Sequence, residues 1–184
     1  RYSYNFNDLY VITSYKGICN IIEDRYPAIY KHLKKYETKL RQRGQVEGKN
    51  GRSGSMQHHW TELDNNISLE KLDDFNKQKI VFSEIVQTAQ FYLDNEAFVI
   101  NDTVTFISGS KLDFLIDYLN SSVVFNIYSK FYAGGSLGSN GTRVKKTFLE
   151  KLPIPQIKLS SNDIDQQIKE ILGLTDKELQ FIIQ

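Results

Sequence analysis

The chain has 184 residues, of which 40% are hydrophobic and 12% aromatic, so it can bury a core and is not a disordered segment. A single cysteine and three histidines exclude a disulfide framework and leave too few ligands for a Cys-rich zinc site. No apolar run approaches the roughly 20 residues that span a bilayer, and the N-terminus has no signal-peptide core, so we expect a cytoplasmic protein.

The formal net charge of +1 conceals two regions of opposite charge. Residues 31–52 hold eight Lys or Arg and two Glu, whereas residues 62–74 hold five acidic residues and one Lys. The basic region indicates either contact with a polyanion or a solvated surface. The chain also begins without methionine, so we expect it to be one domain of a larger protein.

The first half of the chain is mainly helical in pattern. Pro27 suits a first helical turn, and apolar residues then recur every three or four positions, which predicts an amphipathic helix at 27–43 with a basic polar face. Residues 44–58 contain four glycines and show no periodicity, which predicts a long loop. Three shorter elements are also predicted: a strand at 8–13, a strand at 59–63 with Trp60 inward, and a helix at 68–75 capped by Ser68.

The second half of the chain predicts a β core followed by helices. β-branched and aromatic runs indicate strands at 79–85, 90–94, 97–100 and 103–107, with Phe91, Tyr92, Phe98 and Phe106 in the core of the sheet. Apolar stripes indicate helices at 112–120 and 124–131. After residue 155 the pattern changes to two short helices, at 164–171 and at 175–182, the second opened by a capping box of Thr175 and Glu178.

A loop at 134–141 combines glycines with small polar residues and precedes a basic stretch. Glycines expose backbone N–H groups, and the cations that follow neutralise phosphates, so this composition favours DNA contact. It is not a nucleotide P-loop, because no Gly-Lys-Ser/Thr closes it onto a helix. The alternative is a connection without a function. The residues predicted to contact DNA here are Arg143, reading guanine, Lys145 and Lys146, on phosphates, and the polar Ser136, Ser139 and Asn140.

The helix at 27–43 and the loop after it provide a second basic surface. Such a run of cations usually forms a solvated face, and that alternative stays open. The cations nearest the loop are the better candidates for phosphate contact. We therefore predict that DNA is also bound by Arg41, Arg43, Lys49 and Arg52.

His58, His59 and Trp60 form a cluster of side chains that could read a base. The two histidines could also bind a metal, but adjacent residues of a strand project in different directions and no third ligand has a suitable spacing. We therefore expect no metal site. A single Trp in such a segment is better explained as a core residue than as a base-stacking platform.

The sequence lacks the motifs of two enzymes that act on DNA. A metal-dependent nuclease needs an Asp and a Glu-x-Lys on adjacent strands, and Glu37 to Lys39 falls inside the predicted helix. A methyltransferase needs a glycine-rich cofactor turn and an Asn/Asp-Pro-Pro-Tyr/Phe loop, and no two of the three prolines are adjacent. We expect neither catalysis nor a bound cofactor in this chain.

Several short motifs, in this order, resemble the TaqI-like C-terminal specificity domain. They lie at 26–33, 40–43, 60–63, 75–81, 91–94, 115–121 and, as Leu-Pro-Ile-Pro, at 152–155, with further similarity at 1–4 and 174–179. The resemblance implies an α+β fold: a twisted, mainly antiparallel sheet packed with helices, DNA-reading loops at one side and a short helical C-terminal tail. It also implies a target-recognition domain at 1–158 with appended helices at 159–184.

This resemblance implies a domain that binds double-stranded DNA and reads bases in the major groove. It would do so for a methyltransferase domain elsewhere in the same parent chain, which flips out the target adenine. The expected parent is a type IIG restriction-modification enzyme or an adenine-N6 DNA methyltransferase of a bacterium or archaeon, using S-adenosylmethionine and Mg²⁺. The alternative is a protein-interaction module that docks through the apolar residues of its tail: Ile164, Ile168, Ile171, Leu179 and Ile182.

Overall fold

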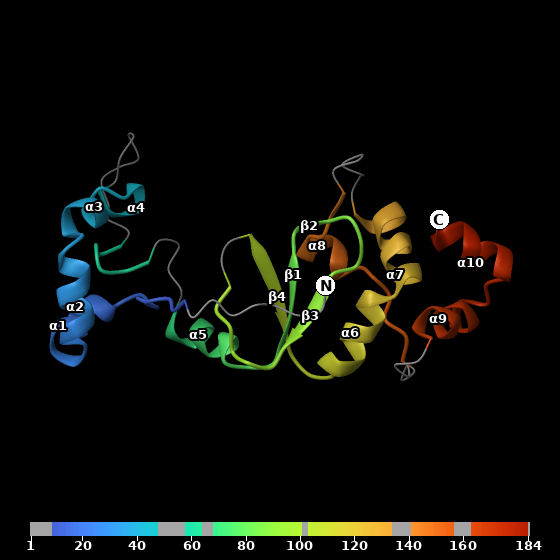
Figure 1. Cartoon of the computed structure of the whole chain (residues 1–184), viewed down its shortest axis with the longest axis horizontal. Helices are drawn as coiled ribbons and strands as arrows, with labels where there is room; N and C mark the ends of the chain where they lie inside the picture. The colour runs from blue at the N-terminus through green and yellow to red at the C-terminus, as the bar shows by residue number, and fades with distance from the viewer. Residues whose placement is uncertain are drawn as a thin grey trace. The chain divides into compact units, whose positions relative to one another are not determined.

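The computed structural model describes residues 9–47, 58–63, 68–100, 103–133, 141–156 and 163–183 (Figure 1). The chain divides into two compact units, which we call the N-terminal unit, Phe6–Phe75, and the C-terminal unit, Asn76–Gln184 together with the first residues of the chain. Helices and small antiparallel sheets make up the described residues, so the predicted α+β class is confirmed. None of the helices in these ranges is both long enough and apolar enough to span a membrane.

Short helices make up the N-terminal unit. They are the 3₁₀ turn η1 (Ile18–Asn20), α1 (Ile22–Arg25), α2 (Pro27–Lys34), α3 (Glu37–Arg41), α4 (Gly44–Glu47) and α5 (Leu69–Phe75). Pro27 opens α2 as predicted. The predicted helix at 27–43 is interrupted between α2 and α3, because the N–H groups of Lys35 and Tyr36 bond to carbonyls three residues back, at 3.2 and 2.9 Å.

Two predicted strands of the N-terminal unit are wrong. The described residues of 8–13 contain no strand, and residues 58–63 form turns. Here side chains, not a neighbouring strand, satisfy the backbone N–H groups. The carboxylate of Glu62 accepts the N–H groups of Gly17 at 2.7 Å and of His59 at 3.3 Å. A backbone bond from Leu63 N to Ser14 O, 2.9 Å, joins the same two segments.

Other predictions for this unit are confirmed. Trp60 is buried, at 3% exposure. Ser68 caps α5 by accepting the N–H of Lys71 at 3.3 Å. The predicted loop at 44–58 begins instead with α4, which buries Val46, and residues 48–57 lie outside the described residues.

A three-stranded antiparallel sheet forms the centre of the C-terminal unit. Strand β1 (Lys79–Ser83) lies between β3 (Phe91–Asp94) and β4 (Val104–Ser108). A second ladder pairs β2 (Ile85–Val86) with β5 (Thr142–Arg143). The predicted strand at 97–100 is wrong, because the chain turns there: Ala97 has a φ of 59°, and the N–H groups of Glu96 and Phe98 donate to the carboxylate of Asp94.

Helices complete the unit: α6 (Leu112–Asn120), α7 (Ser122–Ile127), the π-helical segment η2 (Tyr128–Tyr132), α8 (Lys146–Leu149), α9 (Ile164–Leu172) and α10 (Asp176–Ile183). Of these, α6 packs against β1 and β3, whereas α9 and α10 lie beyond it, against α7 (Figure 1). The main core contains Ile80, Phe82 and Phe91 together with apolar residues of α6 and α7. Tyr92 and Phe106 were predicted in this core but are only partly buried. Both pair with Val81, so strand alternation places them on the opposite face of the sheet.

A buried ion pair joins two strands of the sheet. Lys79 Nζ lies 2.5 Å from an Asp94 carboxylate oxygen, and the two side chains are 0% and 1% exposed. The same carboxylate holds the turn at residues 95–98, so both of its oxygens are occupied. This turn and the pair together form one fixed end of the sheet.

The C-terminal tail packs against α7, and it belongs to the same compact unit as the sheet. Its predicted capping box is confirmed: Thr175 N donates to the carboxylate of Glu178 at 2.8 Å, and Glu178 N donates back to Thr175 Oγ1 at 3.3 Å. The domain boundary predicted between residues 158 and 159 falls outside the described residues.

Candidate nucleic-acid interface

The basic segment 143–146 follows a glycine that no other residue could replace without strain. Gly141 has a φ of +106°, and a Cβ placed on it would lie 2.7 Å from the carbonyl oxygen of Val86. One residue later, the hydroxyl groups of Thr142 and Ser129 hydrogen-bond at 2.7 Å. The entry to the segment is therefore fixed against both β2 and η2.

The buried hydroxyl of Tyr128 holds the next part of the segment. It donates to the carbonyl of Arg143 at 3.1 Å and accepts the N–H of Lys145 at 3.3 Å. Between these two residues Val144 is buried, and its N–H donates to Glu84 O at 2.8 Å. Burial raises the pKa of Tyr128, so the hydroxyl keeps the proton that it donates.

The π-helical turn of η2 aims these groups at β5. Ala133 N bonds to Tyr128 O at 3.0 Å, five residues back, which is the widened spacing of a π-helix. Single π turns occur frequently at functional sites. Here the turn leads directly to the predicted glycine loop, whose residues 134–140 lie outside the described residues, including Ser136, Ser139 and Asn140.

The side chains of the basic segment contrast with its fixed backbone. Lys145 is exposed, and Lys146 is 80% exposed beside Glu150 at 3.6 Å. Arg143 is half-buried, and within the part of the chain that the structure describes its Nε has no hydrogen-bond partner. Because this Nε is buried, it is the terminal nitrogens of the guanidinium that would meet an acceptor supplied from outside.

The second basic surface, on α3 and after it, uses its arginines internally. Arg43 donates from its guanidinium to the carbonyls of Leu40 at 3.0 Å, Trp60 at 3.0 Å and Glu62 at 2.6 Å. These bonds hold the turns at 58–63 in place of a strand ladder. Arg43 therefore has fewer donors to offer a phosphate than its charge suggests.

Arg41 keeps more of its surface but also has partners. Its guanidinium contacts the carboxylate of Glu37 at 2.7 Å and lies 5.4 Å from the centre of the Trp60 ring. The side chain is 50% exposed. Lys49 and Arg52, the other two cations predicted to bind DNA here, lie outside the described residues.

The histidines beside Trp60 are parts of this packing. His59 Nδ1 accepts the N–H of Thr61 at 3.3 Å and also contacts the Thr61 hydroxyl at 2.8 Å, so the proton of the neutral ring is on Nε2. Burial lowers the pKa of His59, which favours this neutral form. Among the described residues, no group of three or more His, Cys, Asp or Glu could hold a metal ion.

The residues at 118–121 connect three parts of the C-terminal unit. The hydroxyl of Tyr118 donates to Pro153 O, and the Asn120 amide pairs with both backbone groups of Phe91, at 3.1 and 2.9 Å. Ser121 caps α7 and donates to Asp165 at 2.6 Å. These contacts join the motif at 115–121 to those at 91–94 and 152–155, so the three motifs that carry the family resemblance here are connected by structural hydrogen bonds.

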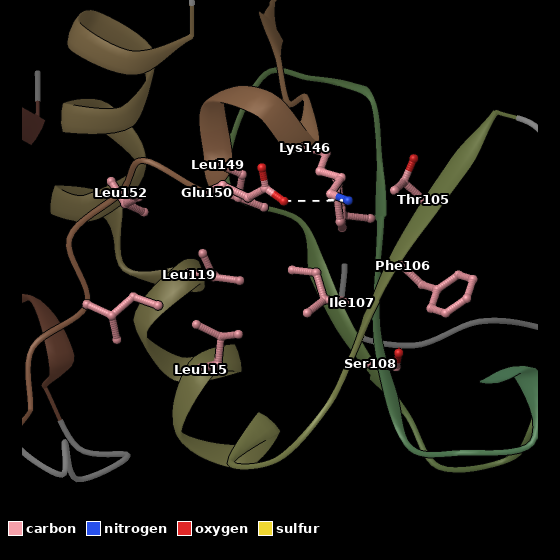
Figure 2. A pocket seen from close by; sticks show the side chains of 12 residues that line it. Thr105, Phe106, Ile107, Ser108, Leu115, Leu119, Lys146, Leu149, Glu150 and Leu152 are labelled. Atoms are coloured by element: carbon pink, nitrogen blue, oxygen red, sulfur yellow. Dashed lines mark ion pairs between the residues drawn. The ribbon is translucent and has the colours of Figure 1, made fainter.

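Beside the sheet, a pocket of about 380 Å³ has an almost entirely apolar lining. Figure 2 shows Ile107, Leu115, Leu119, Leu149 and Leu152 around it, with the ion pair of Lys146 and Glu150 at one side. Apart from this exposed pair, its lining carries no titratable side chain. The lining therefore suits an apolar group.

The exposed Lys145 and Lys146 follow a backbone that its own contacts fix, and cations placed in this way can neutralise phosphates. A model of the TaqI-like C-terminal specificity domain matches residues 29–154. This is more than half of the chain, which therefore belongs to the TaqI-like C-terminal specificity domain family. Such domains recognise the DNA target of restriction-modification enzymes and are generally non-catalytic. A search of curated proteins finds no match.

Proposed function

We propose that this chain is the target-recognition domain of a type IIG restriction-modification enzyme or of a closely related adenine-N6 DNA methyltransferase. It binds double-stranded DNA and reads bases in the major groove, and it performs no chemistry itself. A methyltransferase domain of the same parent chain, using S-adenosylmethionine, modifies the adenine in the cytoplasm, and Mg²⁺ would serve a parent that also cuts DNA. Family membership and the exposed Lys145 and Lys146 of the basic segment 143–146 support this proposal.

The single observation that carries the proposal is the difference between backbone and side chains in the basic segment. Its backbone is bonded to β2 and η2, while the side chains of Lys145 and Lys146 are exposed and that of Arg143 is half-buried. Reading a base requires a guanidinium at a defined position, and phosphate contact requires only a cation within reach. We assign base reading to Arg143 and phosphate contact to the two lysines.

The remaining predicted contacts complete the interface. Ser136, Ser139 and Asn140 supply polar groups from the glycine loop, and the cations of the N-terminal unit bind phosphates. In that unit Arg41, Lys49 and Arg52 are the main contributors, because the guanidinium of Arg43 is already bonded to backbone carbonyls.

Charge reversal tests the proposal. The double variant Arg143→Glu with Lys145→Glu is compared with Lys177→Glu, an exposed lysine of α10 outside the family match. Binding to a fluorescently labelled duplex of mixed sequence is measured by anisotropy from about 50 to 200 mM salt. We expect the double variant to lose retention of DNA and the control to bind like the unmodified chain. Equal binding by both variants, or affinity that is flat across the salt range, would contradict the proposal.

The structure weakens the alternative of a docking module built on the helical tail. Ile168 is buried at 2% exposure, and Ile164, Leu179 and Ile182 pack against the core of their own unit. Most of the apolar stripe predicted to meet a partner is therefore used within the chain. Under this alternative the charge reversal above would leave function unchanged, so the same experiment separates the two readings.

A further inference from the structure

We infer that Tyr128 is a positioning residue for sequence reading, an inference that rests on the proposed function and deepens it. Tyr128 is 2% exposed and does not reach the surface, so it does not contact DNA itself. Its hydroxyl bonds on either side of Val144, to the carbonyl of Arg143 and to the N–H of Lys145. It thereby determines where the Arg143 side chain leaves the backbone.

The physical need for such a residue follows from the length of β5. A two-residue strand paired only with the two residues of β2 fixes its backbone weakly. A guanidinium reads two acceptors of guanine only if it is held within a fraction of an ångström, whereas a lysine tolerates movement on a phosphate. The Tyr128 hydroxyl adds two hydrogen bonds to the backbone beside Arg143, the residue whose side chain tolerates the least movement.

Neighbouring contacts support the same role. The hydroxyl pair of Ser129 and Thr142 lies one residue before Arg143, and the π-helical turn places residues 128 and 129 toward the segment together. The buried Arg143 Nε has no partner within the described part of the chain, so the backbone, not a salt bridge, sets the direction of this side chain.

The C-terminal unit offers a matched control. Tyr118 is also buried, at 5% exposure, and its hydroxyl also donates to a backbone carbonyl, that of Pro153. The variants Tyr128→Phe and Tyr118→Phe each remove one buried hydroxyl from the same unit. Only the first loosens the basic segment.

The experiment selects preferred sites for the unmodified chain from a duplex library with a randomised core, and then measures the affinity of each variant for the selected and the random duplexes. We expect Tyr128→Phe to keep its affinity for random DNA and its salt dependence, and to lose about tenfold or more of the ratio between selected and random DNA. Tyr118→Phe should keep that ratio. Thr142→Val, which removes only the hydroxyl contact to Ser129, should reduce it less, and it tests the inference if Tyr128→Phe fails to fold.

Unchanged discrimination in both Tyr128→Phe and Thr142→Val would overturn the inference, and so would an equal loss in Tyr118→Phe, which would show a general effect of destabilisation. These results leave the proposed function standing. A failure of the unmodified chain to select any sequence would instead overturn the proposed function, and the inference with it.

Discussion

The two basic regions of this chain both carry positive charge, but they differ in whether the cations or other groups hold the backbone in place. In the N-terminal unit the arginine side chains hold the backbone: Arg43 bonds to three carbonyls, and Arg41 is engaged by Glu37 and Trp60. In the C-terminal unit other groups hold the backbone of the basic segment, and the side chains of Lys145 and Lys146 are exposed. A cation that stabilises its own fold is less available to a ligand, so charge alone does not identify the interface.

The largest expected effect concerns the glycine that begins the basic segment. Gly141→Ala adds a Cβ 2.7 Å from Val86 O and forces a side chain onto a φ of +106°, so we expect a loss of about 3 kcal/mol in the stability of the C-terminal unit. Gly17→Ala in the N-terminal unit, at a φ of +87° with open space around it, should cost about 1 kcal/mol.

Urea unfolding separates the two units, because Trp60, the single Trp of the chain, reports on the N-terminal unit, while far-UV circular dichroism reports on both. A Gly141→Ala variant that unfolds like the unmodified chain would show that the segment is not held closely against β2.

The next expected effect is a pH dependence of the stability of the C-terminal unit. Burial raises the pKa of Tyr118 to about 12, against about 10 in the unfolded chain. The folded unit therefore holds this proton more tightly, and its stabilisation is complete below pH 10 and is lost as the pH rises toward 12, by about 2 to 3 kcal/mol. Tyrosine absorbance and circular dichroism follow this transition. Tyr118→Phe should remove its contribution, and a curve of unchanged shape in that variant would contradict the assignment.

A smaller effect is expected for the arginine that holds the N-terminal unit. Arg43→Ala removes two hydrogen bonds to carbonyls of the turns and one to Leu40 O, and should cost about 2 kcal/mol in unfolding followed by Trp60 fluorescence. Arg41→Ala breaks an ion pair that is half exposed, so its cost should stay within about 0.5 kcal/mol. The reverse order of these two costs would show that the roles of the arginines are exchanged.

The smallest effect on stability is expected in the basic segment itself. Lys145 is exposed, so Lys145→Ala should change the free energy of unfolding by no more than about 0.5 kcal/mol. If the lysine contacts a phosphate, the slope of log affinity against log salt should fall by about 0.9. An unchanged slope would remove Lys145 from the interface, while leaving Arg143 to be tested separately.

Local signals in the sequence predicted local structure well. The capping box at Thr175 and Glu178, the cap at Ser68 and the helix at 112–120 depend on residues within a few positions of one another, and all three are confirmed. The predicted strand at 59–63 is wrong because the guanidinium of Arg43 binds the carbonyls of Trp60 and Glu62, a contact that only the tertiary fold creates.

The candidate site was predictable only in part for the same reason. Arg43 and Arg143 have the same chemistry in the sequence, and only the carbonyls of Trp60 and Glu62, 17 and 19 residues along the chain from Arg43, distinguish them. Tyr128 was assigned to an apolar helix face, and no sequence pattern showed that its hydroxyl meets a segment 15 to 17 residues later. The order of the family motifs along the sequence was enough to predict the fold class. The contacts of individual side chains could be learned only from the structure.

The pairing of the Asn120 amide with Phe91 also affects how readily two copies of this chain can aggregate through the edge of the sheet. Strand β3 is at the border of its sheet, where unpaired N–H and C=O groups invite another chain to add a strand. The amide of Asn120 occupies both groups of Phe91 as a neighbouring strand would. Part of that border is thereby closed to aggregation, and the side chain that closes it belongs to the same short motif that links α6 to the sheet.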